Sequence, residues 1–148
     1  MSNIRIRTTK LSDINQLVKV ERQSYNYKYS HWKDKNFRKY LNRKSTLAIV
    51  ACDGTTIVGK AMGIMYKREG DIRFDVYDVS VIPEYRGFGI GARLLRTLER
   101  RAIKLDSVSS SLYVRRNNYK ALCLYRKLGY ISIKCGNRWG LNRMVKHF

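Results

Sequence analysis

Hydrophobic residues recur along the chain at two spacings, which predicts a mixture of strands and helices. A period of two, or a short apolar run between turn residues, predicts strands over residues 3–8, 46–52, 56–66, 73–81, 109–114, 130–135 and 138–145. A period near 3.6 predicts a helix that begins at Ser12 or Asp13, and further helices over residues 89–105 and 118–128. Hairpins and helical crossovers alternate in this order. The expected fold is therefore α/β (α+β), with a mixed central sheet of about seven strands flanked by about four helices.

Two helical segments carry an apolar face that predicts which side chains are buried. The helix over 89–105 is expected to bury Ile90, Leu94, Leu95, Leu98 and Ile103. Residues 22–44 are irregular or helical, and basic and aromatic residues interleave in them. This segment could form one wall of an acceptor site, stack on single-stranded RNA, or pack as an amphipathic helix. In the last case Trp32, Phe37, Tyr40 and Leu41 would point inward.

Length and composition narrow the class of protein. The 148 residues predict a single domain, residues 1–148, and a hydrophobic share of 44% is enough to build a packed core. Neither a membrane-spanning run nor an apolar leader is present, so we expect a cytoplasmic protein without membrane contact. Three cysteines without CxxC spacing and two histidines argue against a disulfide framework, a metal site and a Ser-His-Asp hydrolase.

The charge is far from balanced. The chain has 31 Lys and Arg against 11 Asp and Glu, which gives a formal net charge of +20. Such a surface attracts polyanions, so contact with nucleic acid or the ribosome is one expectation, and a solvated basic surface is the other. Arg93, Arg96, Arg100 and Lys104 follow one another at helical spacing and could contact phosphates or form a solvated face.

The segment with the clearest chemistry joins the strand over 73–81 to the helix over 89–105. Its loop carries Gly87, Gly89 and Gly91, and it opens directly into the helix. Free N–H groups at a helix start, together with the positive end of the helix dipole, suit a diphosphate, and Arg86 adds a cation. A tight strand-to-helix turn would give the same pattern. Neither GxGxxG nor a P-loop is present, which argues against dinucleotide and NTP binding.

Two sequence blocks resemble the GNAT superfamily of N-acetyltransferases. The first, Arg86-Gly87-Phe88-Gly89-Ile90-Gly91-Ala92, is similar to the acetyl-CoA signature of that superfamily. The second, residues 112–130, resembles its ending of a strand, an Asn, a helix and an LYxxLGF motif, particularly in the ribosomal-protein N-terminal acetyltransferase branch. The resemblance implies a GNAT-like fold and acetyl-CoA as co-substrate. It also implies direct attack of a primary amine, from a protein, a peptide or a small molecule, on the thioester.

The resemblance also implies roles for individual residues. The backbone from Arg86 to Ala92 would hold the diphosphate, and the edge of Val79, Ser80 and Val81 would pair with pantetheine like an added strand. Asn118 would hydrogen-bond the cofactor arm. Tyr125 would protonate the departing thiolate, although core packing would also explain a tyrosine on that helical face.

The chain departs from this branch at the general base and at the hairpin loop over the peptide. Tyr113 stands where the branch carries a glutamate, and a short turn with Arg138-Trp139 replaces a tyrosine-bearing loop. Asp75 or Asp78 could act as base through water, or either could be a plain solvated aspartate. Without a bulge, Asp75 would share a strand face with Tyr77 and Val79, and Asp78 would share the other with Ser80.

The absence of the glutamate base affects which amines the protein can be expected to acetylate. Deprotonating a lysine-type amine at pH 7 costs about 4–5 kcal/mol, against about 1 kcal/mol for an α-amino group. The sequence therefore favours an amine of low pKa as acceptor. The alternative function is a nucleic-acid- or ribosome-binding protein of the same fold with weak or no catalysis.

Overall fold

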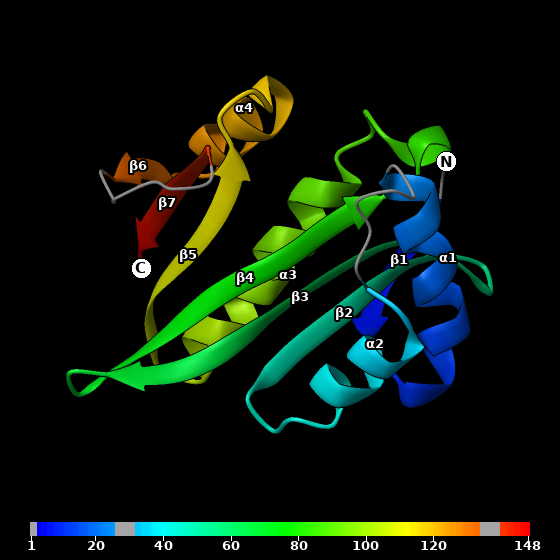
Figure 1. The fold of residues 1–148 in the computed structure, drawn as a ribbon, viewed down its shortest axis with the longest axis horizontal. Helices are drawn as coiled ribbons and strands as arrows, with labels where there is room; N and C mark the ends of the chain where they lie inside the picture. The colour runs from blue at the N-terminus through cyan, green and yellow to red at the C-terminus, as the bar shows by residue number, and fades with distance from the viewer. Residues whose placement is uncertain (1–2, 26–31, 134–139) are drawn as a thin grey trace.

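The computed structural model describes residues 3–25, 32–133 and 140–148 (Figure 1). One sheet contains seven strands in the order β1-β2-β3-β4-β5-β7-β6 over these residues. The strands are β1 (Ile4–Thr8), β2 (Thr46–Asp53), β3 (Thr56–Arg68), β4 (Asp71–Val81), β5 (Ser107–Arg115), β6 (Ile131–Ile133) and β7 (Leu141–His147). The helices are α1 (Ile14–Ser24), α2 (Asp34–Leu41), α3 (Ile90–Lys104) and α4 (Tyr119–Lys127).

The mixed α/β class and the order of the elements are confirmed, and most element ends lie within a few residues of the expected ones. Asp13 precedes α1 in a short 3-10 turn, where its carboxylate accepts the Lys10 N–H at 2.7 Å and pairs with Arg7 at 2.8 Å. The turn expected around residues 136–137, with Arg138 and Trp139, lies outside the described residues.

The two faces of the sheet are covered by different helices. α3 packs across β2, β3, β4 and β5, whereas α1 and α2 pack on the opposite face over β2, β3 and β4. Alternation along β4 shows these two faces. The side chains of Val79 and Val81 lie beside Gly91 of α3, and those of Asp78 and Ser80 lie against Tyr25 at the end of α1.

Apolar side chains fill the space between the sheet and its helices. Leu94, Leu95 and Leu98 of α3 are fully buried on one face. On the other face Phe37 is fully buried, and Trp32, Tyr40 and Leu41 pack partly buried around the core, which confirms the inward side of α2. Ile103, expected to be buried, is 47% exposed, because it lies about half a turn around α3 from Leu94. Ala102 takes the buried position instead.

Only one pair of neighbouring strands in the described sheet is parallel, and that pair separates. β4 and β5 pair from Ile72 with Ser107 to Val76 with Leu112. Beyond this point β4 continues alongside β3, and β5 continues alongside β7. The two halves of the sheet diverge there, with α4 beyond the end of β5 and the start of α3 beyond the end of β4 (Figure 1). Residues 77–81 of β4 and residues 113–115 of β5 are therefore not paired with each other, and we call the region between them the opening.

Candidate functional site

The edge of β4 in this opening carries main-chain groups that no strand occupies. The Ile82 N–H donates to the Val58 carbonyl of β3 at 2.9 Å, so the Val81 carbonyl points away from β3 and into the opening. By the alternation of an antiparallel ladder, the main-chain groups of Val79 point the same way, and those of Ser80 face β3. Of the three residues expected to pair with pantetheine, Val79 and Val81 thus present their backbone to the opening.

The loop after β4 carries a run of main-chain amides without an acceptor among the described residues. Gly87 and Gly89 have φ of +83° and +79°, and Gly89 is the N-cap of α3. Left-handed conformations at these two positions suit glycine and turn successive N–H groups inward, as in an anion-binding nest. The amides of residues 87–92 donate no hydrogen bond to the described part of the chain. We call these six amides the amide cup.

Arg86 holds the cup in place and does not extend it. Its own N–H donates to the Pro83 carbonyl at 3.2 Å. Its side chain donates from Nε to the Val81 carbonyl at 2.8 Å and from Nη2 to the Ser24 carbonyl at 3.1 Å. The expected cation therefore lies beside the cup, while its donors tie the loop to the end of β4 and the end of α1.

Tyr125 and Asn118 lie on the β5 side of the opening. The Tyr125 ring meets the buried Tyr130 ring edge-on at a centroid distance of 6.0 Å, and its hydroxyl has no hydrogen-bond partner among the described residues. Burial and the charge of Asp78 raise the pKa of Tyr125 to about 12. The Asn118 side chain caps α4 by accepting the Ala121 N–H at 3.2 Å, so its carbonyl is used and its amide N–H groups remain available.

A buried network of charges underlies the same stretch of β4. The Lys60 ammonium pairs with Glu21 at 2.7 Å and with Asp78, and all three side chains are at least nine-tenths buried. Burial alone would lower the pKa of Lys60, but the charges of Asp78 and Glu21 outweigh it and raise this pKa. One cation between two carboxylates leaves an excess of one negative charge. We call this group the Lys60 network.

Two hydroxyls complete the Lys60 network. Tyr25 donates to Asp78 Oδ1 at 3.0 Å and Ser80 donates to the same oxygen at 2.7 Å. Tyr25 as a whole residue is 42% exposed, but its hydroxyl points inward, and burial of that hydroxyl and the Asp78 charge raise its pKa. Both oxygens of Asp78 are therefore occupied by donors.

The two candidate bases occupy different places. A register shift between β3 and β4 sets Val76 opposite Gly63 and Asp78 opposite Met62, which leaves Tyr77 as an extra residue. Tyr77 accordingly lies against Tyr40 of α2, with ring centroids 5.9 Å apart, on the same face as Asp78. Without a bulge Tyr77 would share a face with Val79, but because of the bulge it lies on the face of Asp78. Asp75 lies before the opening, where β4 still pairs with β5, and accepts a hydrogen bond from Ser111.

Sequence reasoning missed Lys60, Glu21 and the inward hydroxyl of Tyr25. A signal was present for the first two residues. Lys60 is the one charged residue in the apolar run from Ile57 to Ile64, and Glu21 continues the apolar stripe of Ile14 and Leu17 on α1. A charge at a core position needs a partner of opposite charge. The two residues together predict a buried pair.

Two further properties concern membranes and metal ions, for the described residues. None of the helices there has the length and apolarity needed to cross a bilayer. Among the same residues, no three His, Cys, Asp or Glu side chains gather as ligands for a metal ion.

Comparisons with known proteins agree with this geometry. Residues 14–130 match the model of the acetyltransferase (GNAT) family. An N-acetyltransferase of Archaeoglobus fulgidus is 29% identical over 136 residues, covering 81% of this chain and 88% of that protein. The N-alpha-acetyltransferase RimI of Mycobacterium tuberculosis is 32% identical over 111 residues, covering 73% of this chain and 66% of that protein. The PaiA N-acetyltransferase of Thermoplasma acidophilum, crystallised with coenzyme A, superposes with a TM-score of 0.88 at 21% identity, over 99% of each chain.

Proposed function

The chain belongs to the acetyltransferase (GNAT) family and is an acetyl-CoA-dependent N-acetyltransferase, and we propose that its acceptor is an α-amino group. The observation that carries the proposal is that both candidate bases already have hydrogen-bond or ion-pair partners within the protein. Asp78 is held by Lys60, Tyr25 and Ser80, and Asp75 by Ser111. Neither carboxylate stands free in the opening to take a proton from a strongly basic amine.

The energetics then select the acceptor. At pH 7 an α-amino group with pKa near 8 loses its proton to water at a cost of about 1 kcal/mol. A lysine side chain with pKa near 10.4 costs about 4–5 kcal/mol, a difference of roughly 300-fold in the reactive population. A site without a free base therefore acts far more readily on α-amino groups than on lysine side chains. The name of the Mycobacterium tuberculosis relative, an N-alpha-acetyltransferase, agrees with this choice.

The coenzyme would lie along the opening. Its diphosphate would occupy the amide cup, where N–H groups without an internal acceptor adjoin the positive end of α3. Its pantetheine arm would pair with the main-chain groups of Val79 and with the Val81 N–H, as an added strand does, because Arg86 already occupies the Val81 carbonyl. The Asn118 amide group is placed on the other side to contact that arm. This arrangement would set the thioester between β4 and β5.

The Lys60 network would favour a cationic acceptor. Its excess negative charge lies next to the opening, as the effect of Asp78 on the pKa of Tyr125 indicates. The exposed rings of Tyr77 and Tyr113 stand on the two strands that border the opening. An incoming ammonium group is attracted to this region, loses a proton to water, and attacks as the neutral amine.

In the transfer step the amine nitrogen forms a bond to the acetyl carbon, and the bond from that carbon to sulfur breaks. The nitrogen, which is positively charged after the attack, releases one proton to water. Tyr125 is protonated at neutral pH because its pKa is about 12, so it can donate to the departing sulfur. Complete transfer to a thiolate whose thiol has a pKa near 8.5 is uphill by about 5 kcal/mol. Tyr125 therefore stabilises the sulfur through a hydrogen bond, and the thiolate later takes its proton from water.

An amine panel tests the acceptor. Release of free coenzyme A thiol is followed at pH 7 with acetyl-CoA and three acceptors. These are a lysine-free peptide with a free N-terminus, the same peptide with a blocked N-terminus and one internal lysine, and a polyamine. We expect the free N-terminus to react at least 100-fold faster than the internal lysine. Faster acetylation of the lysine peptide or the polyamine would contradict the proposal.

A further inference from the structure

Two tyrosines meet at the end of α4 because of the way that this helix ends. The Gly129 N–H donates to the Arg126 carbonyl at 3.0 Å, and the Tyr130 N–H donates to the Tyr125 carbonyl at 3.0 Å. Gly129 has φ +98°, so the two bonds form a Schellman motif with a left-handed glycine. This motif commonly brings the side chains on either side of the turn into contact. Here the ring of Tyr130 meets the ring of Tyr125 edge-on, with centroids 6.0 Å apart.

The Tyr130 hydroxyl is anchored in the core. It donates to Glu99 Oε1 of α3 at 2.9 Å and is also hydrogen-bonded to Ser110 Oγ of β5 at 2.7 Å. All three side chains are buried. Burial and the charge of Glu99 raise the pKa of Tyr130, so this hydroxyl stays a donor at neutral pH. The Tyr130 ring is therefore fixed at its hydroxyl end.

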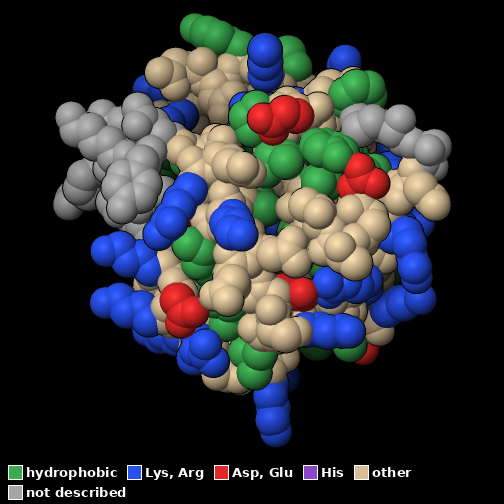
Figure 2. Space-filling view, turned by 90° about the vertical axis from the view of Figure 1, so that its right-hand side faces the viewer, with side chains coloured by type: hydrophobic (Ala, Val, Ile, Leu, Met, Phe, Trp, Pro, Cys, Tyr) green, Lys and Arg blue, Asp and Glu red, His purple; other side chains and the backbone are tan. Residues whose placement is uncertain are grey.

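Glu99 is itself held by a cation. Most charged side chains lie at a protein surface, and Figure 2 shows Lys and Arg spread over the face that carries α1. Glu99 is instead buried, and its Oε2 pairs with Lys146 Nζ of β7 at 2.9 Å. The same ammonium group lies 5.9 Å from the centroid of the Tyr130 ring. Both oxygens of Glu99 thus have partners, as a buried carboxylate requires.

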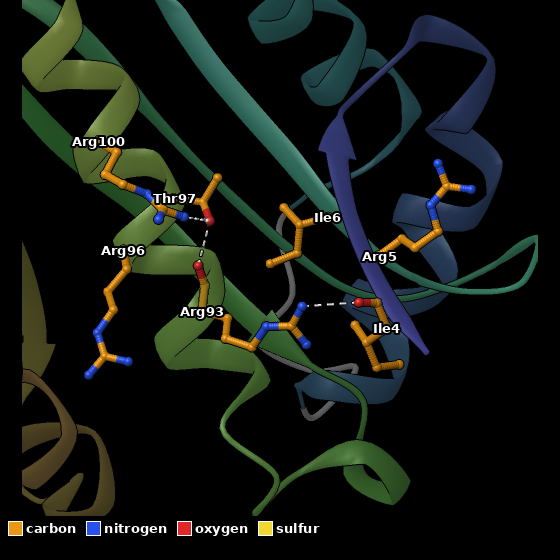
Figure 3. A pocket seen from close by; sticks show the side chains of 7 residues that line it. All are labelled: Ile4, Arg5, Ile6, Arg93, Arg96, Thr97 and Arg100. Carbon is orange, nitrogen blue, oxygen red and sulfur yellow. Dashed lines mark hydrogen bonds between the residues drawn. The ribbon is translucent and has the colours of Figure 1, made fainter. Parts of the chain in front are cut away.

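The helix that carries Glu99 is also joined to the far edge of the sheet. Arg93 Nη2 donates to the Ile4 carbonyl of β1 at 3.0 Å (Figure 3). Arg101 Nη1 donates to Thr8 Oγ1 of the same strand at 2.7 Å. These two arginines tie α3 to the edge strand β1, and Glu99 ties it to β7 near the other edge. The position of Glu99 is therefore set by contacts with both sides of the sheet.

Tyr125 has no such anchor of its own. Its hydroxyl has no hydrogen-bond partner among the described residues, so the direction of this side chain is set by the packing of its ring. A donor to the departing sulfur must be aimed closely, since a misplacement of about 1 Å can slow a reaction about 100-fold. We propose that Tyr130 is a positioning residue for Tyr125: its ring, anchored through Glu99 and Ser110, holds the Tyr125 ring in the direction needed for transfer. This inference rests on the proposed role of Tyr125 in the transfer step.

A purely structural role for Tyr130 predicts different behaviour. A core residue that only stabilises the fold lowers Tm when it is changed, and the molecules that remain folded keep the same kcat. A positioning residue lowers kcat, and it does so only while the Tyr125 hydroxyl is present. The dependence on Tyr125 therefore separates the two roles.

A double-mutant cycle on the full chain tests the proposal. Tyr130→Phe removes the anchored hydroxyl and keeps the ring, Tyr130→Leu removes the ring, and each is made with and without Tyr125→Phe. Thiol release is followed at pH 7 with saturating acetyl-CoA and the fastest acceptor of the amine panel, so the result does not depend on which acceptor is preferred. We expect Tyr130→Leu to lower kcat about 10-fold and Tyr130→Phe about 3-fold, with the KM for acetyl-CoA unchanged. In the Tyr125→Phe background each should lower kcat by less than about 2-fold.

Val50→Ala is the matched control for lost stability. Val50 is fully buried in β2 and takes no part in the contacts of Tyr130 or Glu99 described above. The cavity left by this change should lower Tm, as changes at Tyr130 do, and should keep kcat within about 2-fold of wild type.

Three results would overturn the proposal. They are a wild-type kcat in Tyr130→Leu, a loss of kcat by the same factor in both backgrounds, and an equal loss of kcat in Val50→Ala. An unchanged kcat in Tyr130→Phe alone would overturn the part assigned to Glu99 and Ser110. If Tyr125→Phe itself keeps the wild-type kcat, the donor role of Tyr125 fails and this inference fails with it. Failure of the positioning alone would leave the loss in Tyr125→Phe in place, so the two failures can be told apart.

Discussion

Removing the Lys60 ammonium would leave Glu21 and Asp78 buried with no cation between them. Lys60 is 3% exposed, Glu21 3% and Asp78 8%, so water cannot replace the lost charge. Lys60→Met keeps the length of the side chain and most of its volume. The main change in this variant is therefore electrostatic.

The magnitude follows from the burial of the pair. Breaking a buried ion pair by removing one partner costs about 3–5 kcal/mol, because an uncompensated charge stays behind. This is a large share of the roughly 5–15 kcal/mol by which domains are stable. For a chain of 148 residues each kcal/mol lowers Tm by about 2–4 °C, so the expected drop is about 6–20 °C.

The pH dependence has a definite sign. In the wild type the charges of Asp78 and Glu21 outweigh burial and raise the pKa of Lys60, so Lys60 is charged at pH 5 and pH 7, and its stabilisation is lost as the pH rises through the folded-state pKa. In Lys60→Met the buried carboxylates are expected to take up a proton on folding, which makes folding more favourable at low pH. The loss of stability should therefore be larger at pH 7 than at pH 5.

Urea unfolding at pH 5 and pH 7 measures both effects. Lys19→Met, at an exposed position of α1, is the matched control and should stay within about 0.5 kcal/mol of wild type. Adding Asp78→Asn to Lys60→Met should recover part of the loss, since it removes one buried charge. A cost below about 1 kcal/mol for Lys60→Met, or no recovery and no pH dependence, would refute the reasoning.

Two predictions concern catalysis and coenzyme binding. Tyr125→Phe should lower kcat about 10- to 100-fold, the cost of one hydrogen bond to a charged group, with KM for acetyl-CoA unchanged. An unchanged kcat in Tyr125→Phe would remove Tyr125 from the mechanism. Because its pKa is about 12, Tyr125 stays protonated, so the wild-type rate should not fall with rising pH below about pH 10. Gly89→Ala should weaken acetyl-CoA binding about 10-fold by calorimetry, because alanine at φ +79° distorts the amide cup. Gly70→Ala, at φ +85° in the β3–β4 turn, is the matched control, and equal effects of the two would contradict a role for the cup.

The sequence determined the fold well because local patterns coincide with the sheet. The period-two runs and the amphipathic face of α3 predicted nearly all strands and helices. The amide cup was also predictable, since glycines before a helix imply both left-handed φ and free N–H groups. Ile103 failed because one apolar residue off the main stripe of α3 was counted with it.

The Lys60 network could not be derived in full from the sequence. Glu21, Lys60 and Asp78 come from three elements, and their meeting depends on how α1 sits over β3 and β4. The register shift at Met62 and Gly63 also changes which β4 side chains share a face, and no sequence signal marked it. The occupied state of Asp75 and Asp78, which decides the proposed acceptor, depends on these long-range contacts.

The central claim is that the amides of residues 87–92 bind the diphosphate of acetyl-CoA. A ¹H–¹⁵N NMR titration of the labelled chain tests it, with acetyl-CoA in one series and acetyl-pantetheine, which lacks the diphosphate, in the other. The amides of Gly87, Gly89 and Gly91 should shift strongly with acetyl-CoA and little with acetyl-pantetheine, whereas those of Val79 and Val81 should shift with both. Saturation with acetyl-CoA that leaves the three glycine amides unmoved would contradict the account.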